Sequence, residues 1–466
     1  MQSDFDIIII GAGPAGMSAA IEAAKHAASV CILDEQASGG GQIYRNVSNT
    51  NQGQADILGK DYLAGRQYVD GLRHAKILHR AGVTVWKVDK TGTVVFSDAG
   101  RAEQIKGRHI VLATGAMERA VPLPGWTLPG VLTVGAAQIL MKSGSIVARD
   151  AVLIGSGPLL YLVATQLLAA GAPPKALVET QTRRDLVAAL PHLAKALRDW
   201  KQLFKGVRMI AALKWAGVPR FKAASDIAIE GEENAEAIRF RAGGKDHCID
   251  TNIVLLHQGV VPNTQISRSL GLEHHYDHTQ RCFHPVIDEF GQASHPMFSI
   301  AGDGAGIGGA KVAALSGRIC ALNALVRIKK ISEGERDNVV RELDRSRRKE
   351  LSIRPFLDTL YPPPQSVLLP EDETIICRCE EVTAGDIRRY AKLGCKGPNQ
   401  TKSFGRSGMG PCQGRFCGLT VTEILAAETA ETQDAVGSYR IRAPLKPVTL
   451  AELAALAKTN EKEAAE

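Results

Sequence analysis

Aromatic residues are scarce in the 466-residue chain, at 5% of the total, and no segment combines them with a stripe of Lys and Arg. The net charge is only +7, and Glu342 and Asp344 interrupt the most basic stretch, residues 336–349. Interleaved charges of this kind are typical of a solvated helix face, so we expect no nucleic-acid partner. The remaining composition, 45% hydrophobic and 23% charged, predicts a globular protein of two or three domains.

The chain also lacks an N-terminal apolar segment of the signal-peptide kind, and it enters a predicted strand within a few residues of Met1. Its 9 cysteines are odd in number and four of them are clustered, which favours a reducing compartment, so we expect a cytoplasmic location. Residues 151–172 carry no charge and are long enough to span a bilayer. The turn Gly155-Ser156-Gly157-Pro158 divides them, however, and we expect a buried strand and helix instead.

No Ser–His–Asp set and no pair of carboxylates stands out as catalytic machinery, and no Cys-x-x-Cys accompanies a nucleotide-binding turn. Disulfide-reductase chemistry is therefore disfavoured. His257 ends an apolar stretch and could line a site, but a hydrogen-bonded structural histidine is the more ordinary interpretation. The sequence thus predicts no catalytic residue.

Four cysteines do gather near the C-terminal end, in Cys377-Arg378-Cys379 and in Cys412–Cys417. The glycine-rich run 408–414 leaves backbone N–H groups able to face sulfur. Four thiolates surrounded by N–H donors suit a [2Fe–2S] cluster. A structural zinc ion is the alternative, although zinc ribbons more often use Cys-x-x-Cys pairs. The predicted metal ligands are Cys377, Cys379, Cys412 and Cys417.

A dinucleotide-binding fingerprint opens the chain. The apolar run Phe5–Ile10 leads into Gly11-Ala12-Gly13-Pro14-Ala15-Gly16 and then a helical stretch at residues 17–26. A second predicted strand, residues 29–33, ends at Asp34. In this context the helix start faces phosphates, and the carboxylate accepts hydrogen bonds from ribose hydroxyls. We predict a bound adenine dinucleotide.

Two further glycine-rich segments point to the same ligand. Gly39–Arg45 allows the backbone to approach a ligand closely, and Arg45 could meet a phosphate, although a flexible surface loop is the alternative. Gly302-Asp303-Gly304 follows a predicted strand and precedes a helix at 310–323, so Asp303 is aimed at a phosphate or a polyol. Between them, residues 83–88 and 94–96 predict a small β element.

The strand–turn–helix pattern restarts at Ala151. A strand at 152–154, a turn, a helix at 161–170 and a strand closing on Glu179 predict a second nucleotide-type fold. Leu160 stands where the third glycine is expected, and its bulk at the helix–strand contact disfavours a nicotinamide cofactor. We expect a retained scaffold that binds another nucleotide or none.

After a charged helix at 333–351, five prolines between Pro355 and Pro370 predict a linker without regular structure. Thr383 is predicted to cap a helix at 386–393, and another helix is predicted at 418–427. The tail at 439–447 is basic and extended, suited to lying on another surface, and a short helix is predicted at 450–458.

The chain resembles the flavoproteins with two dinucleotide-binding domains over about residues 4–328. The resemblance rests on four features in order along the chain: the turn Gly11–Gly16, Asp34, Ala113-Thr114-Gly115, and Gly302-Asp303. That resemblance implies that the first motif binds FAD and that Asp303 contacts its ribityl chain. The cysteine segments resemble the bacterioferritin-associated-ferredoxin type of [2Fe–2S] domain, with a longer spacing in the closing pair. The implied cofactor-binding residues are Gly11, Gly13, Pro14, Ala15, Gly16, Asp34, Glu35, Gly41, Gln42, Arg45, Val88, Ala113, Thr114, Gly115, Gly302 and Asp303.

The implied fold class is α/β, with two Rossmann-like domains of the glutathione-reductase type and a small C-terminal [2Fe–2S] domain. The predicted domains are 1–118 with 286–330 for FAD, 119–285 for the second Rossmann-like domain, 331–371 for the helix and linker, 372–430 for the cluster, and 431–466 for the tail.

Five short sequence segments resemble one family more closely. They are similar to the A (α) subunits of opine (octopine or nopaline) oxidases and dehydrogenases, D-hydroxyproline dehydrogenase and hydrogen cyanide synthase. These segments are residues 40–45, 124–131, 377–382, 408–415 and 439–444. Ser407 stands where several relatives carry an extra cysteine, so that position cannot be a ligand here.

The resemblance implies that a separate B (β) subunit, which is an FAD protein resembling D-amino-acid oxidase, oxidises the amine. The α-type subunit then relays electrons, often with an FMN near the subunit interface, and a small third subunit is a further option. We expect the electron-transfer subunit of a heteromeric dehydrogenase that oxidises a C–N bond of an opine or an imino or D-amino acid such as D-hydroxyproline. Alternatives are a component of hydrogen cyanide synthase that acts on glycine, a self-contained NAD(P)H-dependent ferredoxin-reductase-like enzyme, and a regulatory partner that binds nucleotide and metal structurally.

Overall fold

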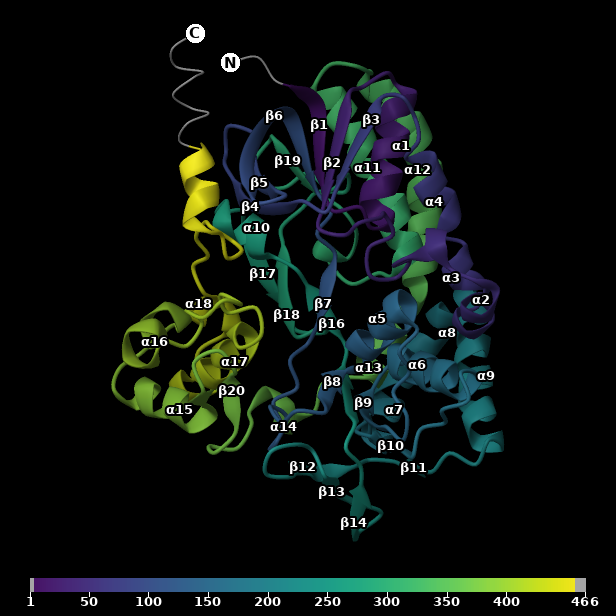
Figure 1. Ribbon diagram of the computed structural model, residues 1–466, viewed down its shortest axis with the longest axis vertical. Coiled ribbons are helices and arrows are strands. Elements are labelled where there is room, and N and C mark those ends of the chain that lie inside the picture. Colours follow the sequence, from purple (N-terminus) through teal and green to yellow (C-terminus); the bar gives the residue numbers. More distant parts are fainter. Residues whose placement is uncertain (1–3, 457–466) are drawn as a thin grey trace.

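The computed structural model describes residues 4–456. Figure 1 shows a Rossmann-like domain at the top, a second one at the lower right, and the cysteine-containing segment at the lower left. We call this last segment, residues 371–441, the cysteine module. The predicted α/β class is confirmed.

The first domain is built on a seven-stranded sheet ordered β3-β2-β1-β6-β5-β4, with β19 also paired to β6. β1 runs parallel to β2 and β6, and Ile7, Ile8 and Ile9 are completely buried because helices and strands cover both faces of the sheet. The strands are β1 (Phe5–Ile10), β2 (Val30–Asp34), β3 (Ile77–Ala81), β4 (Thr84–Val88), β5 (Thr93–Asp98), β6 (Arg101–Leu112) and β19 (Phe298–Ile300).

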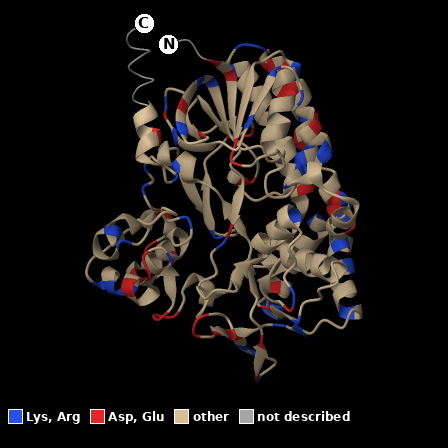
Figure 2. Cartoon of the chain, in the orientation of Figure 1, with Lys and Arg blue, Asp and Glu red and all other residues tan. Residues whose placement is uncertain are grey.

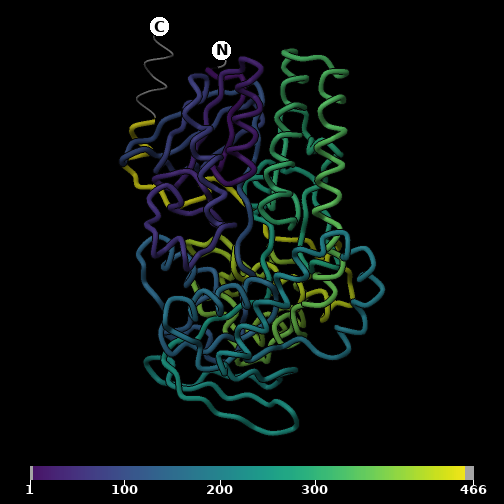
Figure 3. Tube along the Cα trace, turned by 90° about the vertical axis from the view of Figure 1, so that its right-hand side faces the viewer, coloured from purple at the N-terminus to yellow at the C-terminus, as the bar shows by residue number. Residues whose placement is uncertain are grey.

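The β element predicted at 83–88 and 94–96 is confirmed by β4 and β5, whereas β3 was not predicted. Helices α1 (Pro14–Lys25) and α11 (Ala310–Arg327) pack closely, since a Cβ added at Gly317 would lie 2.0 Å from the carbonyl oxygen of Ala15. α12 (Glu333–Glu350) lies beside α11, as Figure 3 shows, and corresponds to the charged helix predicted at 333–351. Shorter helices on the same side are α2 (Gln52–Leu58), α3 (Lys60–Leu63) and α4 (Arg66–Gly71).

The second domain contains a five-stranded sheet ordered β11-β10-β9-β15-β8 and a three-stranded antiparallel sheet, β12-β13-β14. Its strands are β8 (Val131–Thr133), β9 (Val152–Ser156), β10 (Ala176–Glu179), β11 (Arg220–Phe221), β12 (Ser225–Glu230), β13 (Ala237–Ala242), β14 (Lys245–Asp250) and β15 (Val254–Gln258). Its helices are α5 (Val134–Gly144), α6 (Pro158–Ala169), α7 (Arg183–Ala189), α8 (Leu193–Ala196) and α9 (Trp200–Trp215). The charge-free stretch at 151–172 is thus a strand and a helix, as predicted.

Two small ribbons lie between the domains and the cysteine module. β7 (Ala116–Glu118) pairs with β16 (Val260–Pro262), and β17 (His274–Asp277) pairs with β18 (Cys282–Pro285). Helix α10 (Gln265–Ser269) connects them.

The proline-rich segment is not free of regular structure, so that prediction was wrong. It forms α13 (Arg354–Leu360) and α14 (Gln365–Leu368). Pro355 sits at the start of α13, where proline is tolerated because the first helical N–H groups have no intrahelical partner. Phe356 packs with Ala189 and Ala196 of the second domain, so the segment is docked rather than loose.

The cysteine module contains β20 (Ile375–Cys377), β21 (Val382–Thr383), α15 (Ala384–Lys392), α16 (Pro398–Gly405), α17 (Gly418–Thr429) and α18 (Gln433–Val436). The predicted cap is confirmed: Thr383 and Asp386 form a reciprocal capping box at the start of α15. The predicted helix at 418–427 corresponds to α17.

The tail after α18 packs on this chain itself. Tyr439 and Leu445 are buried. The Leu445 N–H donates to the Trp86 carbonyl at 2.8 Å, and Lys446 forms an ion pair with Glu35 at 2.8 Å. The surface on which the predicted extended tail lies is therefore, at least in part, the chain's own first domain. Residues 450–456 are helical, and the end predicted at Lys458 lies outside the described residues.

Charged residues lie mainly on the outer helices and loops in Figure 2, with both signs interspersed. Over residues 4–456, no helix combines the length and apolarity that crossing a membrane requires.

Candidate functional site

The first glycine-rich turn has the geometry of a phosphate cradle. A Cβ at Gly11 would lie 2.4 Å from the Ala113 carbonyl oxygen, and one at Gly16 would lie 1.9 Å from the Gly11 carbonyl oxygen, so the backbone segments touch. Gly13 precedes α1, and no side chain caps that helix. Gly41 faces Gly13, with its added Cβ only 2.8 Å from the Gly13 Cα. The uncapped helix start therefore remains suited to an anion.

Asp34 holds this turn in place. Its two carboxylate oxygens accept hydrogen bonds from the Ala12 N–H at 2.5 Å and the Gln36 N–H at 2.7 Å. Burial raises the pKa of the Asp34 carboxyl, against the two backbone N–H donors, which lower it. The neighbouring Glu35 is exposed and pairs with Lys446 instead. Asp34, rather than Glu35, is thus the carboxylate beside the cradle.

The segment 39–45 is an ordered part of the site. Arg45 hydrogen-bonds Gln36 and donates to Gln42 at 3.0 Å, while its buried Nε has no hydrogen-bond partner. Lys142 of α5, buried beneath the segment, donates to the carbonyls of Gln42 and Ile43 at 3.0 Å each. Sequence reasoning missed Lys142, because a lysine on a helix gives no sign of its burial.

The later glycine-rich segment meets the first at the same place. Gly302 lies against Ala15: a Cβ added at Gly302 would be only 2.8 Å from the Cβ of Ala15. One oxygen of Asp303 accepts hydrogen bonds from the N–H groups of Gly308 and Gly309, both at 2.9 Å, which fixes the loop before α11. The predicted residues from Gly11 to Gly16 therefore adjoin Gly41 and Gly302.

The remaining predicted residues also have defined positions. Ala113-Thr114-Gly115 follows β6, and Thr114 donates to the Asn263 carbonyl at 2.9 Å. Gly115 has a positive φ of 64°. Val88 is buried at the end of β4, and its apolar side chain packs in the core of the first domain.

The four predicted metal ligands form two contacting pairs, Cys377 with Cys417 and Cys379 with Cys412. Contact with the Cys417 thiol, together with backbone N–H donors, lowers the pKa of Cys377 to about 6. The donors are the N–H groups of Gly408, Glu380 and Cys379. This is the N–H···S environment that iron–sulfur sites use.

The pairing bears on the kind of metal site that these thiols could form. Four sulfurs on one tetrahedral zinc would all lie about 3.8 Å apart. Within residues 4–456, the trio of metal-ligand atoms found within 4.8 Å of one another belongs to His275, Asp277 and His284, and no three of these cysteines meet that limit. Two pairs of thiols suit two irons, each with two cysteines.

Tyr439 is the residue that sequence reasoning missed in this module. Its hydroxyl donates to Ser407 Oγ at 3.0 Å and lies within hydrogen-bond reach of the Cys417 sulfur. Its ring fills the space beside Gly408 and Gly414, where added Cβ atoms would lie 2.6 and 2.5 Å from ring atoms. Gly410 likewise touches Cys379, with an added Cβ 2.2 Å from the Cys379 Cβ. The spacing of these glycines could have indicated an aromatic neighbour.

The counterpart of the cradle in the second domain is lined by different residues. Leu160 is fully buried in the core. Glu179, which stands at the ribose-binding position, is also fully buried, hydrogen-bonded to Tyr161 at 2.5 Å and paired with Arg220 at 2.6 Å. Tyr361, just after α13, packs against Tyr161 with ring centroids 6.4 Å apart. His257, hydrogen-bonded to Glu118 at 2.7 Å, is a satisfied structural histidine, as predicted.

A small cavity of about 60 Å³ lies where the cysteine module meets β16 and β18. Two guanidinium groups, from Arg268 and Arg415, line it together with Gln265 and Tyr439. Arg268 stacks on Phe283 at 4.6 Å. The cavity therefore adjoins the Cys417 side of the module.

Two family matches cover most of the chain. Residues 5–317 match the pyridine nucleotide-disulphide oxidoreductase family, and residues 371–457 match the sarcosine oxidase A3 domain. The second match contains all four paired cysteines.

Individual proteins are similar over almost the full length. The A subunit of opine oxidase from Agrobacterium tumefaciens (strain Ach5) is 43% identical, over 98% of this chain and 93% of that protein. The HcnB subunit of hydrogen cyanide synthase from Pseudomonas aeruginosa is 31% identical, over 95% of this chain and 96% of that protein. The crystal structure of L-proline dehydrogenase from P. horikoshii aligns with a TM-score of 0.70 at 18% identity, covering 96% of this chain and 79% of that one.

Proposed function

The chain belongs to the pyridine nucleotide-disulphide oxidoreductase family and, within it, to the opine oxidase A subunits, and on this premise we propose that it relays electrons in a heteromeric opine dehydrogenase. The reaction is oxidation of a C–N bond of an opine such as octopine or nopaline. A D-amino-acid-oxidase-like B subunit carries the substrate pocket, and a small third subunit is an optional addition.

The observation that carries the proposal is the presence of a nucleotide cradle and two thiol pairs in one interlocked chain. Membership of the family implies a flavin cofactor, and we assign FAD to the cradle and a [2Fe–2S] cluster to the thiol pairs. A flavin accepts electrons in pairs, whereas such a cluster passes them singly. An FMN at the interface with the B subunit completes the proposed relay.

The chain's own residues would position these groups rather than act on substrate. Gly13 and Gly41 leave room for the pyrophosphate, and Asp34 accepts from the ribose. Gly410 allows Cys379 to approach the second thiol pair, and Tyr439 shields Cys417 from water. Among the described residues no nucleophile or acid–base pair stands beside the cradle, which supports a substrate pocket on a partner protein. The proposal includes a cytoplasmic location, where thiols stay reduced.

Glycine as substrate is the weaker alternative, because the hydrogen cyanide synthase relative is 31% identical against 43% for the opine oxidase relative. A self-contained NAD(P)H-dependent enzyme is disfavoured because Leu160 replaces the third glycine of the second turn, and because the Glu179 carboxylate already accepts hydrogen bonds from Tyr161 and Arg220.

The test is to express this chain alone and together with a candidate B subunit, a D-amino-acid-oxidase-like FAD protein. Octopine, nopaline, D-hydroxyproline and glycine are assayed with an artificial electron acceptor. We expect no turnover by the chain alone and turnover of an opine by the complex, with an interface above roughly 2,000 Å², as permanent complexes have. Full turnover by the isolated chain would move the substrate site into this sequence and contradict the relay role. Preferred turnover of glycine by the complex would favour the alternative substrate.

A further inference from the structure

One face of the β17–β18 ribbon gathers four side chains of metal-ligand type, whereas His274, on the opposite face, is hydrogen-bonded to Ser267 and the Leu272 carbonyl. Along β17, His275 and Asp277 alternate with Tyr276, and along β18, Cys282 and His284 alternate with Phe283. Successive side chains of a strand point to opposite faces. His275 pairs directly with His284, and Asp277 pairs directly with Cys282. Two histidines, a carboxylate and a thiol therefore form a square on the same face.

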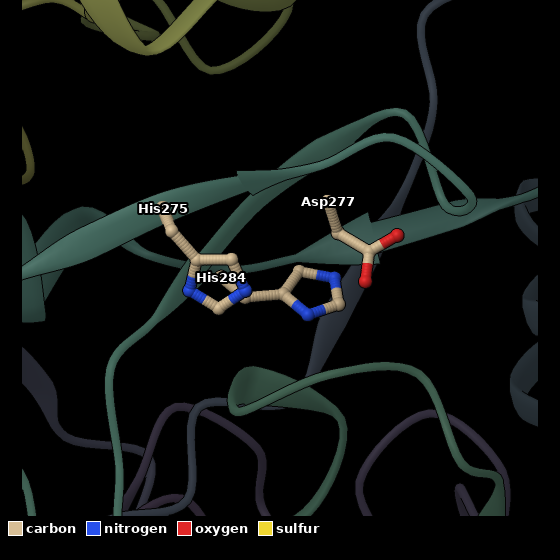
Figure 4. A group of neighbouring side chains, drawn as sticks. All are labelled: His275, Asp277 and His284. Atoms are coloured by element: carbon tan, nitrogen blue, oxygen red, sulfur yellow. The ribbon is translucent and has the colours of Figure 1, made fainter.

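The donor atoms of this face converge. One ligand atom each from His275, Asp277 and His284 lies within 4.8 Å of the other two. The Cys282 sulfur lies 3.5 Å from His284 Nε2. In Figure 4 the His284 ring lies between the His275 ring and the Asp277 carboxylate, and all three side chains project to the same side of the strands.

The rest of the ribbon is firmly held. On the opposite face, Tyr276 and Phe283 are buried and in edge-to-face contact, with ring centroids 5.2 Å apart. In the turn, Asp277 Oδ1 accepts from the N–H groups of Thr279 and Gln280 at 2.8 and 2.7 Å. The buried Arg119 donates to the carbonyls of Gln280 and Arg281. Little backbone freedom would be lost on binding an ion.

We propose that this face binds one zinc ion through His275, Asp277, Cys282 and His284. Imidazole nitrogen, thiolate sulfur and carboxylate oxygen are the donors that zinc takes in tetrahedral sites. Donor atoms around a zinc ion lie about 3.4 Å apart at ordinary bond lengths, so the donors of His275, Asp277 and His284, within 4.8 Å of one another, need small side-chain rotations to close on an ion. The Cys282 sulfur, 3.5 Å from His284 Nε2, supplies the fourth ligand.

The charges around the ribbon suit a divalent cation. Asp277 contributes a negative charge, and the carboxylate of Asp358 lies close enough to influence Asp277 and Cys282. Arg354 pairs with Asp358, and Arg119 lies near Cys282. Ionisation of the thiol on metal binding adds a further negative charge, which offsets the nearby arginines.

The position of the ion gives it a structural role. His284 lies against Gly306, where an added Cβ would be 3.2 Å from its Nδ1. Gln280, in the ribbon's turn, exchanges hydrogen bonds with the backbone of Ile307 at 3.2 Å in each direction. Both Gly306 and Ile307 belong to the loop that carries Asp303. A zinc ion would therefore hold the ribbon against the flavin-domain loop.

The test measures zinc and iron per chain in the full-length protein, purified with and without added Zn²⁺. The informative variants are H275A, which alters an exposed side chain, and C282A. The matched control is H278A, because His278 is exposed in the same hairpin but lies off the ligand face. We expect about one zinc per chain in wild type and H278A, a loss of most of it in H275A and C282A, and unchanged iron in all four.

Cobalt provides a second readout that does not depend on stability. Bound Co²⁺ in wild type should show a thiolate-to-cobalt charge-transfer band that C282A lacks and H278A keeps. Wild-type protein without saturable Zn²⁺ or Co²⁺ binding would overturn the proposal. Zinc that survives H275A and C282A but disappears in C412S would also overturn it, since the ion would then belong to the cysteine module.

Discussion

Trp126 of the second domain donates a hydrogen bond from its indole nitrogen to the backbone carbonyl of Ile375 at 2.6 Å. Ile375 begins the short strand that ends at Cys377, and the Arg378 guanidinium lies over the same indole at 5.4 Å. One side chain therefore anchors the first cysteine pair to the second domain. An electron relay requires such a fixed separation between its centres.

Replacing Trp126 by Phe keeps a ring for Arg378 but leaves the Ile375 carbonyl without its donor. We expect the cysteine module to be less firmly docked by about 1 kcal/mol, the usual net value of a hydrogen bond. Limited proteolysis at residues 361–375 should become faster while iron content stays the same. Unchanged proteolysis would show that the bond does not hold the module.

The variant C377S should lose the visible absorbance of the cluster and retain the flavin spectrum, because the cradle lies in a different domain. The matched control is C395S: Cys395 is also buried in the module, but its thiol only donates to the Gly397 carbonyl at 3.4 Å. Iron and acid-labile sulfide are measured together with the spectrum. Zinc in place of iron in anaerobically purified wild type would contradict the cluster assignment.

The variant D34A should weaken flavin binding by roughly 1.5–3 kcal/mol, since a charged acceptor is lost beside the ribose and the Ala12 N–H loses its partner. That corresponds to a tenfold to hundredfold rise in the dissociation constant. E35Q is the control, because Glu35 contacts Lys446 of the tail instead of the turn. Equal flavin retention by D34A and wild type would reassign the ribose contact.

The burial of His109 predicts that the folded protein loses stability in mild acid. It is buried in the first sheet beside Ser299, with Nε2 2.9 Å from the hydroxyl, and burial lowers its pKa from 6.5 to about 3. Between these values the unfolded chain binds a proton that the folded chain excludes, so stability falls as pH drops from about 6.5 towards 3. The contribution lost between pH 7 and pH 5 is about 2 kcal/mol.

The variant H109Q keeps a hydrogen-bonding group for Ser299 and removes the titration. Urea unfolding at pH 7 and pH 5 should therefore show a smaller acid-induced loss in H109Q than in wild type. An identical loss in both proteins would show that His109 does not control the acid response.

Local patterns predicted much of this molecule. The turn at Gly11–Gly16 could be identified because its strand, turn and helix are contiguous, and the capping pair Thr383 and Asp386 is separated by only three residues. Leu160 argues from sequence alone against a nicotinamide cofactor in the second domain, and this stays a prediction. The packing of Tyr361 on Tyr161 could not be predicted, because Tyr361 comes from a segment that the prolines suggested was unstructured.

Residues recruited over long sequence distances escaped prediction. Lys142 supports the Gln42 loop from another domain, and Tyr439 reaches the cysteine pairs from the tail. The ligand face of β17 and β18 becomes visible only when their register is known, because His275 and His284 are ordinary residues in either strand alone. These contacts depend on packing that no short window of sequence encodes.

The first sheet has a consequence for the chain as it leaves the ribosome. β6 is complete at Leu112, but its partner β19 begins at Phe298, and α11, which packs on α1, follows still later. The whole second domain is translated while the part of β6 that pairs with β19 and the side of α1 that packs on α11 wait for these elements. At synthesis rates of about 5–20 residues per second, the delay lasts from roughly 10 to 40 seconds. Nascent chains should therefore expose an unpaired edge of β6 and the apolar side of α1 during that interval, which makes the middle of translation the stage at which chaperone binding matters most.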